Sequence, residues 1–350
     1  MATTRQLREI FELCFNEPRR WTNWFFSSIA RDSDVVALDI DGRTLSAALM
    51  QRYLFAYCGA TLPSAYISCV GTRPESRGHG HATALLGNCL RRAHAEGLAL
   101  AELIPAEPHL FDYYRHAAGF ATAFYVEERH YTALHPFEAC GEVIEPDYDI
   151  LHRLEQRHGC GVLHSPDDFK YILTDLSLDC GAFMTAARCG DHVALAVAVD
   201  DGRAPSGGIG VRALLADSAE AAETVMAEVR RRVGERPLSV WNVPSEAMRS
   251  LDLKPRGMVR IVNAEKVLSA LAQGNKELNY TVRLRDALLP ENFGCYRLHG
   301  GSCERIASHS RHLDLDVDIT TLATILFSAP ATGSIFNLPT RRPFISMMLD

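Results

Sequence analysis

A glycine-rich turn between a strand-like run and a helix-like run is the feature that most constrains this fold. Residues 66–70 have the pattern of a strand and residues 81–96 that of a helix. A helix N-terminus leaves backbone N–H groups without partners and carries partial positive charge, so it suits a phosphate group. Gly80 and Ala82 keep bulky side chains away from such a ligand, and Arg77 adds a cation. The turn therefore predicts a pyrophosphate site.

The order of elements around this turn argues against a strictly alternating sheet. Apolar spacing predicts two helices within residues 6–29, and three β-like runs follow between residues 34 and 70. After the turn we expect a helix, a strand at 98–104, a short helix at 110–118 and a strand at 123–127. A dinucleotide-binding sheet alternates strands and helices throughout, so the initial meander favours a different mixed α/β (α+β) fold.

The length of 350 residues predicts more than one domain, because single hydrophobic cores stop growing below that size. A new α/β pattern begins near Pro146, and a third pattern opens at Gly257. The glycine pair of the middle part precedes a β-like run and lacks the arginine and glycine spacing of the first turn. We expect domains at 1–133, 134–256 and 257–350.

Composition excludes several classes of function. The net charge of −7 argues against nucleic-acid binding, and the lack of an 18-residue apolar run argues against a membrane partner. Ten scattered cysteines without a CxxC pair are typical of a reducing cytoplasm, so we expect a cytoplasmic protein. His309 and His312 have the spacing of two ligands on a helix, but no third ligand is evident, so no metal is expected.

The turn and a second segment resemble one enzyme family. Arg77-x-x-Gly80-x-Ala82 fits the R/Q-x-x-G-x-G/A motif of GNAT-fold N-acetyltransferases, in the same strand–turn–helix context. Residues 111–120 are similar to the family's Tyr-x-x-x-Gly-Phe element, with one extra residue between Tyr114 and Gly119. The resemblance implies a GNAT fold and acetyl-CoA as co-substrate.

The whole chain resembles the Eis-type ("enhanced intracellular survival") acetyltransferases. These join a GNAT domain, a second degenerate GNAT-like domain and a sterol-carrier-protein-like domain. The segments that carry this likeness are 257–263, 286–292 and the apolar C-terminus. The resemblance implies that the three expected domains have these folds in this order, and we expect a homo-oligomer.

The residues expected at the cofactor lie on the turn and on the strand before it. A backbone N–H near residues 69–71 would polarise the thioester carbonyl as an oxyanion-type donor. Cys69 is expected to be a buried strand thiol, because direct transfer requires no nucleophilic cysteine. The cofactor-binding residues are Cys69, Val70, Gly71, Arg77, Gly78, His79, Gly80, His81 and Ala82.

The resemblance also implies two catalytic residues, Tyr114 as general acid and Asp350 as the carboxylate at the chain's own C-terminus. Tyr113 is an alternative to Tyr114, and either carboxylate of Asp350 is a candidate. An aromatic cluster in the second helix is the expected acceptor-amine site, with ordinary packing as the alternative; its substrate-binding residues are Trp21, Trp24 and Phe25, beside Phe26.

Together these patterns predict an N-acetyltransferase. The acetyl group would pass from acetyl-CoA to a primary amine by direct attack, and the acceptor would be a small polyamine, an aminoglycoside-like molecule or lysine. The alternative is a non-catalytic acyl-CoA-binding sensor, or a lipid- or partner-binding protein.

Overall fold

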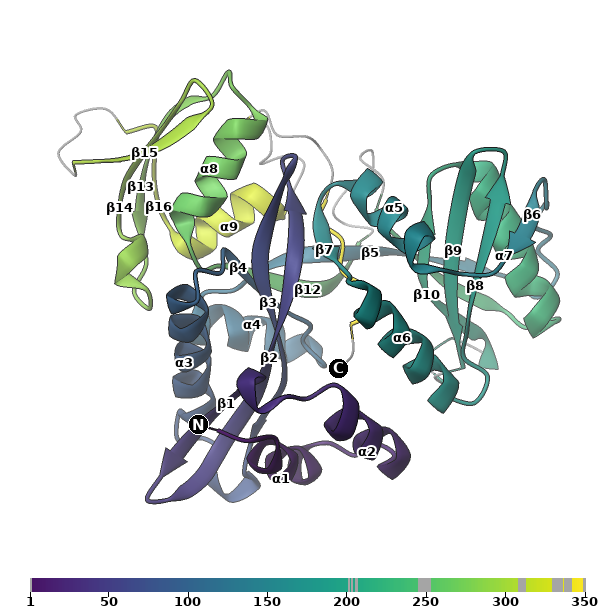
Figure 1. Ribbon diagram of the computed structural model, residues 1–350, viewed down its shortest axis with the longest axis horizontal. Coiled ribbons are helices and arrows are strands. Elements are labelled where there is room, and N and C mark those ends of the chain that lie inside the picture. Colours follow the sequence, from purple (N-terminus) through teal and green to yellow (C-terminus); the bar gives the residue numbers. More distant parts are fainter. Residues whose placement is uncertain are drawn as a thin grey trace. The chain divides into compact units, whose positions relative to one another are not determined.

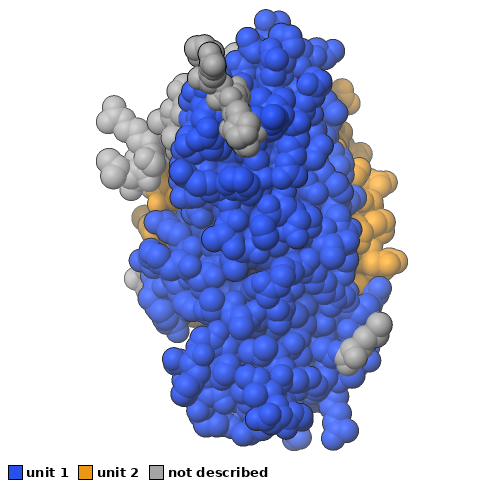
Figure 2. Space-filling model, turned by 90° about the vertical axis from the view of Figure 1, so that its left-hand side faces the viewer, with its two compact units in different colours: residues 1–124, 256–340, 350 blue, residues 125–255, 341–349 orange. Residues whose placement is uncertain are grey.

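The computed structural model describes residues 2–200, 202, 204, 207–244, 253–307, 313–328, 336 and 342–348. The chain divides into two compact units, one of residues 1–124, 256–340 and 350, the other of residues 125–255 and 341–349 (Figure 2). Residues of the expected third domain thus group with the N-terminal part. The boundaries at 133 and 256 stay a prediction.

The first unit begins with the elements that the sequence pattern predicts (Figure 1). Two-residue turns join the first three strands, and both residues of each turn, Asp41-Gly42 and Cys58-Gly59, have positive φ, as in the tight turns that hairpins favour. The elements are α1 (Thr4–Cys14), α2 (Arg19–Ser28), η1 (Asp32–Asp34), β1 (Val35–Ile40), β2 (Arg43–Tyr57), β3 (Ala60–Thr72), η2 (Pro74–Ser76), α3 (His81–Ala95), β4 (Leu100–Leu103) and α4 (Pro108–Ala118).

The sheet of this unit runs in the order β1-β2-β3-β4-β12, where β12 is Lys254–Ile261. β1, β2 and β3 form an antiparallel meander, β4 is parallel to β3, and β12 is antiparallel to β4. The crossover from β3 to β4 passes through α3, as a parallel pair requires. The glycine-rich turn therefore lies where β3 ends and α3 begins.

One face of this sheet packs against α3. Leu85, Leu86 and Leu90 of α3 lie in one buried cluster with Ala65 and Ile67 of β3. The spacing of these leucines places them on one side of the helix, which explains why the helix covers the sheet.

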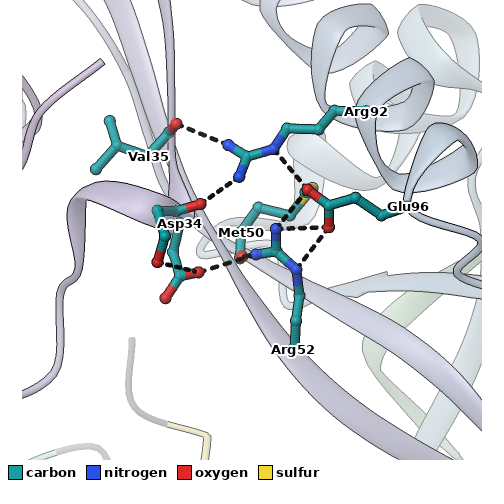
Figure 3. Close-up of polar contacts among 7 residues, drawn as sticks. Asp34, Val35, Met50, Arg52, Arg92 and Glu96 are labelled. Atoms are coloured by element: carbon teal, nitrogen blue, oxygen red, sulfur yellow. Dashed lines mark hydrogen bonds and ion pairs between the residues drawn. The ribbon is translucent and has the colours of Figure 1, made fainter. Parts of the chain in front are cut away.

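An ionic network fixes the C-terminal end of α3 (Figure 3). Glu96 accepts hydrogen bonds of 2.8 Å from Nε of both Arg52 and Arg92. Arg92 also donates to the carbonyl of Val35 at 3.0 Å, and Arg52 lies 3.1 Å from Asp34. Both guanidinium groups contact the same carboxylate, and these contacts hold the C-terminal end of α3 against β1 and β2.

The third part of the chain forms a second, four-stranded sheet of the first unit, in the order β15-β14-β13-β16. A buried ion pair joins it to the first sheet, since Arg260 of β12 lies 2.6 Å from Asp286 and donates from Nε to the Ala118 carbonyl at 2.8 Å. Its elements are α8 (Ala264–Gly274), β13 (Asn279–Arg285), η5 (Pro290–Asn292), β14 (Gly294–His299), β15 (Ser302–Ile306), β16 (Leu315–Asp318) and α9 (Ile319–Phe327).

The second unit repeats the topology of the first. β8, β9 and β10 form an antiparallel meander, α7 follows, and β11 is parallel to β10. This is the order of β1-β2-β3, α3 and β4, so the predicted second copy of the fold is confirmed. The elements are β5 (Ala121–Tyr131, which starts in the first unit), β6 (Glu142–Ile144), α5 (Tyr148–His158), β7 (Gly161–Leu163), α6 (Pro166–Leu178), β8 (Phe183–Cys189), β9 (His192–Val199), β10 (Ile209–Ala216), α7 (Ala219–Val233) and β11 (Leu238–Asn242).

Within the described ranges, every helix is too short or too polar to cross a lipid bilayer.

Candidate active site

A β-bulge interrupts β3 next to the predicted cofactor site. Leu49 of β2 pairs with Ser68, whereas Ala47 pairs with Gly71, so β3 carries one extra residue between the two pairs. Cys69, inside the bulge, is buried and has a φ of 53°. Bulges break the hydrogen-bond ladder and re-aim backbone groups, and they are common beside active sites. The bulge therefore lies at the residues expected to polarise the thioester carbonyl.

The parallel strands β3 and β4 separate at this point. Their pairs are Ser64–Leu100, Ala65–Ala101 and Tyr66–Glu102, after which β3 continues alone to Thr72. Among the described residues, no strand pairs with this side of β3 beyond Tyr66. An extended ligand arm with amide groups, such as pantetheine, suits such an edge as an added strand.

The N-terminus of α3 has the features of an anion site. Gly80 is its N-cap residue with φ of 79°, no side chain caps the helix, and its first turn holds no acidic residue. Gly78 has φ of 81°, and a Cβ atom at Gly78 or Gly80 would meet nothing within 4 Å. The backbone donors of this turn are thus left to an approaching ligand.

Side chains around the turn add a positive charge and a pair of stacked rings. The exposed Arg77 donates from Nε to the Thr72 carbonyl at 3.2 Å, which keeps the guanidinium beside the end of β3. The rings of His79 and His81 stack with centroids 5.9 Å apart, and Nδ1 of His79 lies 3.4 Å from the Ser76 carbonyl. Ala82 follows in the first turn of the helix.

The matching helix end in the second unit is built differently. The Ser218 hydroxyl caps α7 by accepting from the Ala221 amide at 3.1 Å. Asp217 precedes it, with ion pairs to Arg153 at 2.9 Å and Arg157 at 3.3 Å. Burial would raise the pKa of Asp217, but the Val193 amide and Arg153 lower it more, so the group stays ionised. A phosphate would meet a carboxylate and a closed cap there, although a cavity of about 450 Å³ is present. Of these two helix ends, the turn before α3 is the one that suits pyrophosphate.

The two candidate tyrosines have different surroundings. Tyr114 is buried, with its ring 6.2 Å from that of Phe120, and burial raises its pKa, with Tyr113 adding to the effect. Tyr113 is half-buried, and its hydroxyl lies 3.4 Å from Oγ1 of Thr83 in the first turn of α3. The structure therefore brings Tyr113 to the helix end and packs Tyr114 in the core beside it.

The aromatic cluster of α2 is divided between core and surface. Phe25 is fully buried and stacks on Trp21 with centroids 4.8 Å apart and on Phe11 at 6.3 Å. Trp21 and Trp24 are half-buried and lie 6.4 Å apart. Phe25 thus supports the two tryptophans, whose role in acceptor binding stays a prediction. Gly71 has a packing role, since a Cβ there would lie 2.7 Å from Cγ2 of Ile10 in α1.

Some expected residues lie outside the part of the chain that the structure describes. Asp350, His309 and His312 are among them. The described end of the chain, in the second unit, holds Phe344 against β7, with Phe344 N donating to Cys160 and Val162 N donating to Phe344 at 3.0 Å each. The described residues include no group of three or more His, Cys, Asp or Glu side chains arranged to hold a metal ion.

Sequence reasoning missed one acidic residue beside the bulge. Glu102 of β4 is fully buried, and it pairs with Tyr66 where β3 and β4 separate. A glutamate inside the otherwise apolar run 98–104 is the signal that could have found it.

Comparisons with known proteins agree with this geometry. Residues 2–121 match the acetyltransferase (GNAT) domain family. No curated protein matches the chain significantly. Among solved structures, a probable N-acyltransferase from Enterococcus faecalis, itself described as a conserved protein of unknown function, has a TM-score of 0.74 at 16% identity, covering 96% of this chain and 91% of its own.

Two further structures are similar over most of the chain. A GCN5-related N-acetyltransferase from Anabaena variabilis has a TM-score of 0.72 at 18% identity, and Eis1 from Mycobacterium abscessus has 0.69 at 15%. Each comparison covers 95% of this chain and 89% of the other. At such identity the likeness shows the fold. The family match shows a GNAT acetyltransferase domain at residues 2–121, and such a domain supports an acyltransferase.

Proposed function

We propose that this protein transfers an acetyl group from acetyl-CoA to the primary amine of a small polyamine, an aminoglycoside-like molecule or lysine. The observation that carries the proposal is the uncapped, acid-free N-terminus of α3, placed directly after a bulged strand. Pyrophosphate on the turn and pantetheine along β3 would bring a thioester to the backbone of residues 69–71.

The reaction needs polarisation of the thioester carbonyl, a neutral amine and protonation of the leaving thiolate. A backbone donor in the bulge supports the first need. Tyr114 is proposed as the proton donor to the thiolate on the strength of the family resemblance, since a phenol is protonated at neutral pH and has a proton to give. Asp350 is proposed as a carboxylate near the amine, on the strength of the family resemblance.

Thiol release from acetyl-CoA tests this function. We expect turnover with at least one of a set of polyamines, aminoglycosides and lysine peptides. We expect Tyr114→Phe to lower kcat about 100-fold with little change in the Kd of CoA. Tyr113→Phe is the matched comparison, because its hydroxyl contacts Thr83 at the helix end. Removal of Asp350 should lower kcat and leave CoA binding intact.

The result that would refute the proposal is tight CoA binding without turnover on any amine. That result would favour the acyl-CoA sensor. If Tyr113→Phe lowers kcat and Tyr114→Phe does not, the general acid is Tyr113 and the rest of the proposal stands.

The remaining features of the proposal concern the whole protein. We propose a sterol-carrier-protein-like fold for residues 257–350, in which α8 and α9 accompany the sheet β15-β14-β13-β16 (Figure 1). A cytoplasmic homo-oligomer is the proposed state, and sedimentation of the purified protein tests the oligomer.

A further inference from the structure

The second unit repeats the strand bulge of the first unit as well as its topology. In β10, Val211 pairs with Ala198 and Ala213 pairs with Val197, so Arg212 is an extra residue between the two pairs. In each unit the bulge lies close to the carboxyl end of the strand that leads into the crossover helix. Bulges are over-represented beside active sites, so the neighbourhood of this one is a candidate binding site.

A cavity of about 450 Å³ lies at the carboxyl ends of the parallel strands β10 and β11. The last pair of these strands is Leu214–Asn242, and β10 continues to Ala216. Among the described residues, no strand pairs with this side of β10 beyond Leu214. Sheets of parallel strands with crossover helices bind their ligands at this place, and the cavity has the volume of a small-molecule site. All residues of its wall belong to the second unit.

The charged side chains of the wall are paired within the protein. Asp217 lies 3.3 Å from Arg157 and 2.9 Å from Arg153. His158 donates from Nε2 to the Arg342 carbonyl at 2.8 Å, because a carbonyl oxygen is only an acceptor. A charged ligand would have to break one of these pairs or stay unpaired beside them, and either state is costly. The cavity therefore suits an uncharged molecule.

One polar side chain of the wall has an unused donor. Nδ2 of Asn242 is buried, and it donates to no acceptor in the described part of the chain. A donor left in this state costs about 1–3 kcal/mol. Because no hydrogen bond from Nδ2 fixes the carboxamide, a rotation of this group turns the donor towards the cavity that Asn242 lines. A carbonyl oxygen of a ligand would then accept its hydrogen bond.

The rest of the wall selects the remainder of the ligand. Leu154 of α5, Leu214 of β10, Ala222 of α7 and Val243, which follows β11, contribute apolar surface. The open side of β10 adds main-chain N–H and C=O groups, which pair with an amide as a neighbouring strand would. A purely apolar molecule would leave these groups unsatisfied, whereas a secondary amide between apolar groups matches both parts of the wall.

We propose that this cavity binds a small, uncharged molecule in which a secondary amide lies between apolar groups. The amide oxygen accepts a hydrogen bond from Asn242, and the amide pairs with the open side of β10. Two kinds of molecule have this chemistry, a pantetheine arm without phosphates and an N-acylated alkylamine. The proposal concerns binding alone, so it does not depend on the proposed acetyl transfer.

Ligand-observed NMR with pantetheine and with N-butylacetamide tests the proposal. The full chain is first saturated with CoA, which is expected to occupy the turn before α3. At least one of the two amides should bind with a Kd of about 1 mM or tighter. Binding of pantetheine alone identifies the pantetheine arm as the ligand, and binding of N-butylacetamide alone identifies the acylated amine. Hexylammonium and hexanoate, which have similar length but carry a charge, should bind at least tenfold more weakly.

Two substitutions locate the bound amide. Asn242→Leu keeps the approximate size of the side chain and removes the donor, so the Kd of the amide should rise at least tenfold. The melting temperature of this variant should match the wild type, because Nδ2 gives up no hydrogen bond to the described chain. Ala222→Phe places a ring in the cavity and should abolish binding. Ala219→Phe, at an exposed position of the same helix outside the wall, is the matched control and should not.

Three results would overturn the proposal. The first is binding of neither amide, or an equal Kd for the wild type and Asn242→Leu. The second is binding of hexylammonium or hexanoate as tightly as the amides, which would contradict an uncharged ligand. The third is amide binding that Ala222→Phe leaves unchanged, because the amide would then lie elsewhere in the protein. If Asn242→Leu does not fold, the comparison of Ala222→Phe with Ala219→Phe decides alone.

Discussion

Placing a carboxylate on the turn before α3 tests the cofactor site. Gly80 has φ of 79°, with open space where a Cβ would stand. In Gly80→Asp, a carboxylate about 5 Å from a phosphate charge would be repelled by about 3 kcal/mol at an effective dielectric constant of about 20. Screening by salt reduces this to about 2 kcal/mol, which corresponds to about 30-fold weaker binding of CoA.

Gly59 provides a matched control for this substitution. It also has φ of 79° and nothing within 4 Å of its virtual Cβ, but it lies in the turn between β2 and β3. Both variants carry the left-handed backbone cost of about 1 kcal/mol, so their melting temperatures should fall alike.

The assay is calorimetric titration with CoA at low and high salt. Gly80→Asp should lose affinity, more so at low salt, and Gly59→Asp should not. Turnover of S-acetylpantetheine, which lacks the pyrophosphate, should be unchanged in both. Equal CoA affinity in the two variants would refute the assignment of the turn.

Three further predictions concern the structure around the site. Asp286→Ala leaves the buried Arg260 without its ion pair and should cost about 3–5 kcal/mol in urea unfolding, while a change below about 1 kcal/mol would contradict the buried pair. Glu228 has its pKa lowered to about 2, chiefly by hydrogen bonds from Arg231, so its stabilisation is present above about pH 4.5 and is lost as the pH falls toward 2. The difference in unfolding free energy between the wild type and Glu228→Gln should therefore shrink across that window, and a constant difference would contradict the assignment. The sulfur atoms of Cys140 and Cys189 lie 3.8 Å apart, so diamide should join them in a disulfide, and a peptide map without that link would disprove the expected reaction.

Local sequence patterns predicted the helices and turns of the first unit well, because the signals that define them act over a few residues. The turn residues with positive φ, the leucine spacing of α3 and the glycines before it each act within a few residues. The pairing of β12 with β4 joins residues more than 150 positions apart, and no local pattern carries that information. The bulge at Cys69 likewise depends on β2, so only the register in the sheet reveals it.

The candidate site shows the same division. The residues of the turn could be predicted because a helix N-terminus has its own chemistry. Glu102 could not, because its complete burial is a property of the folded sheet. The choice between Tyr113 and Tyr114 depends on which side of α4 faces α3. The extra residue before Gly119 shifts the match to the family's Tyr-x-x-x-Gly-Phe element, so the sequence does not show which tyrosine lies on that side.

The first unit is assembled from distant parts of the chain, and this affects how the protein is made. During synthesis, β4 emerges from the ribosome about 150 residues before β12, its antiparallel neighbour. Until then β4 is an open sheet edge, and such edges promote aggregation. Residues 125–255, the larger part of the second unit, are translated in that interval and are able to fold before β12 emerges. The nascent acetyltransferase domain therefore has a long exposed period, in which we expect chaperones to bind it.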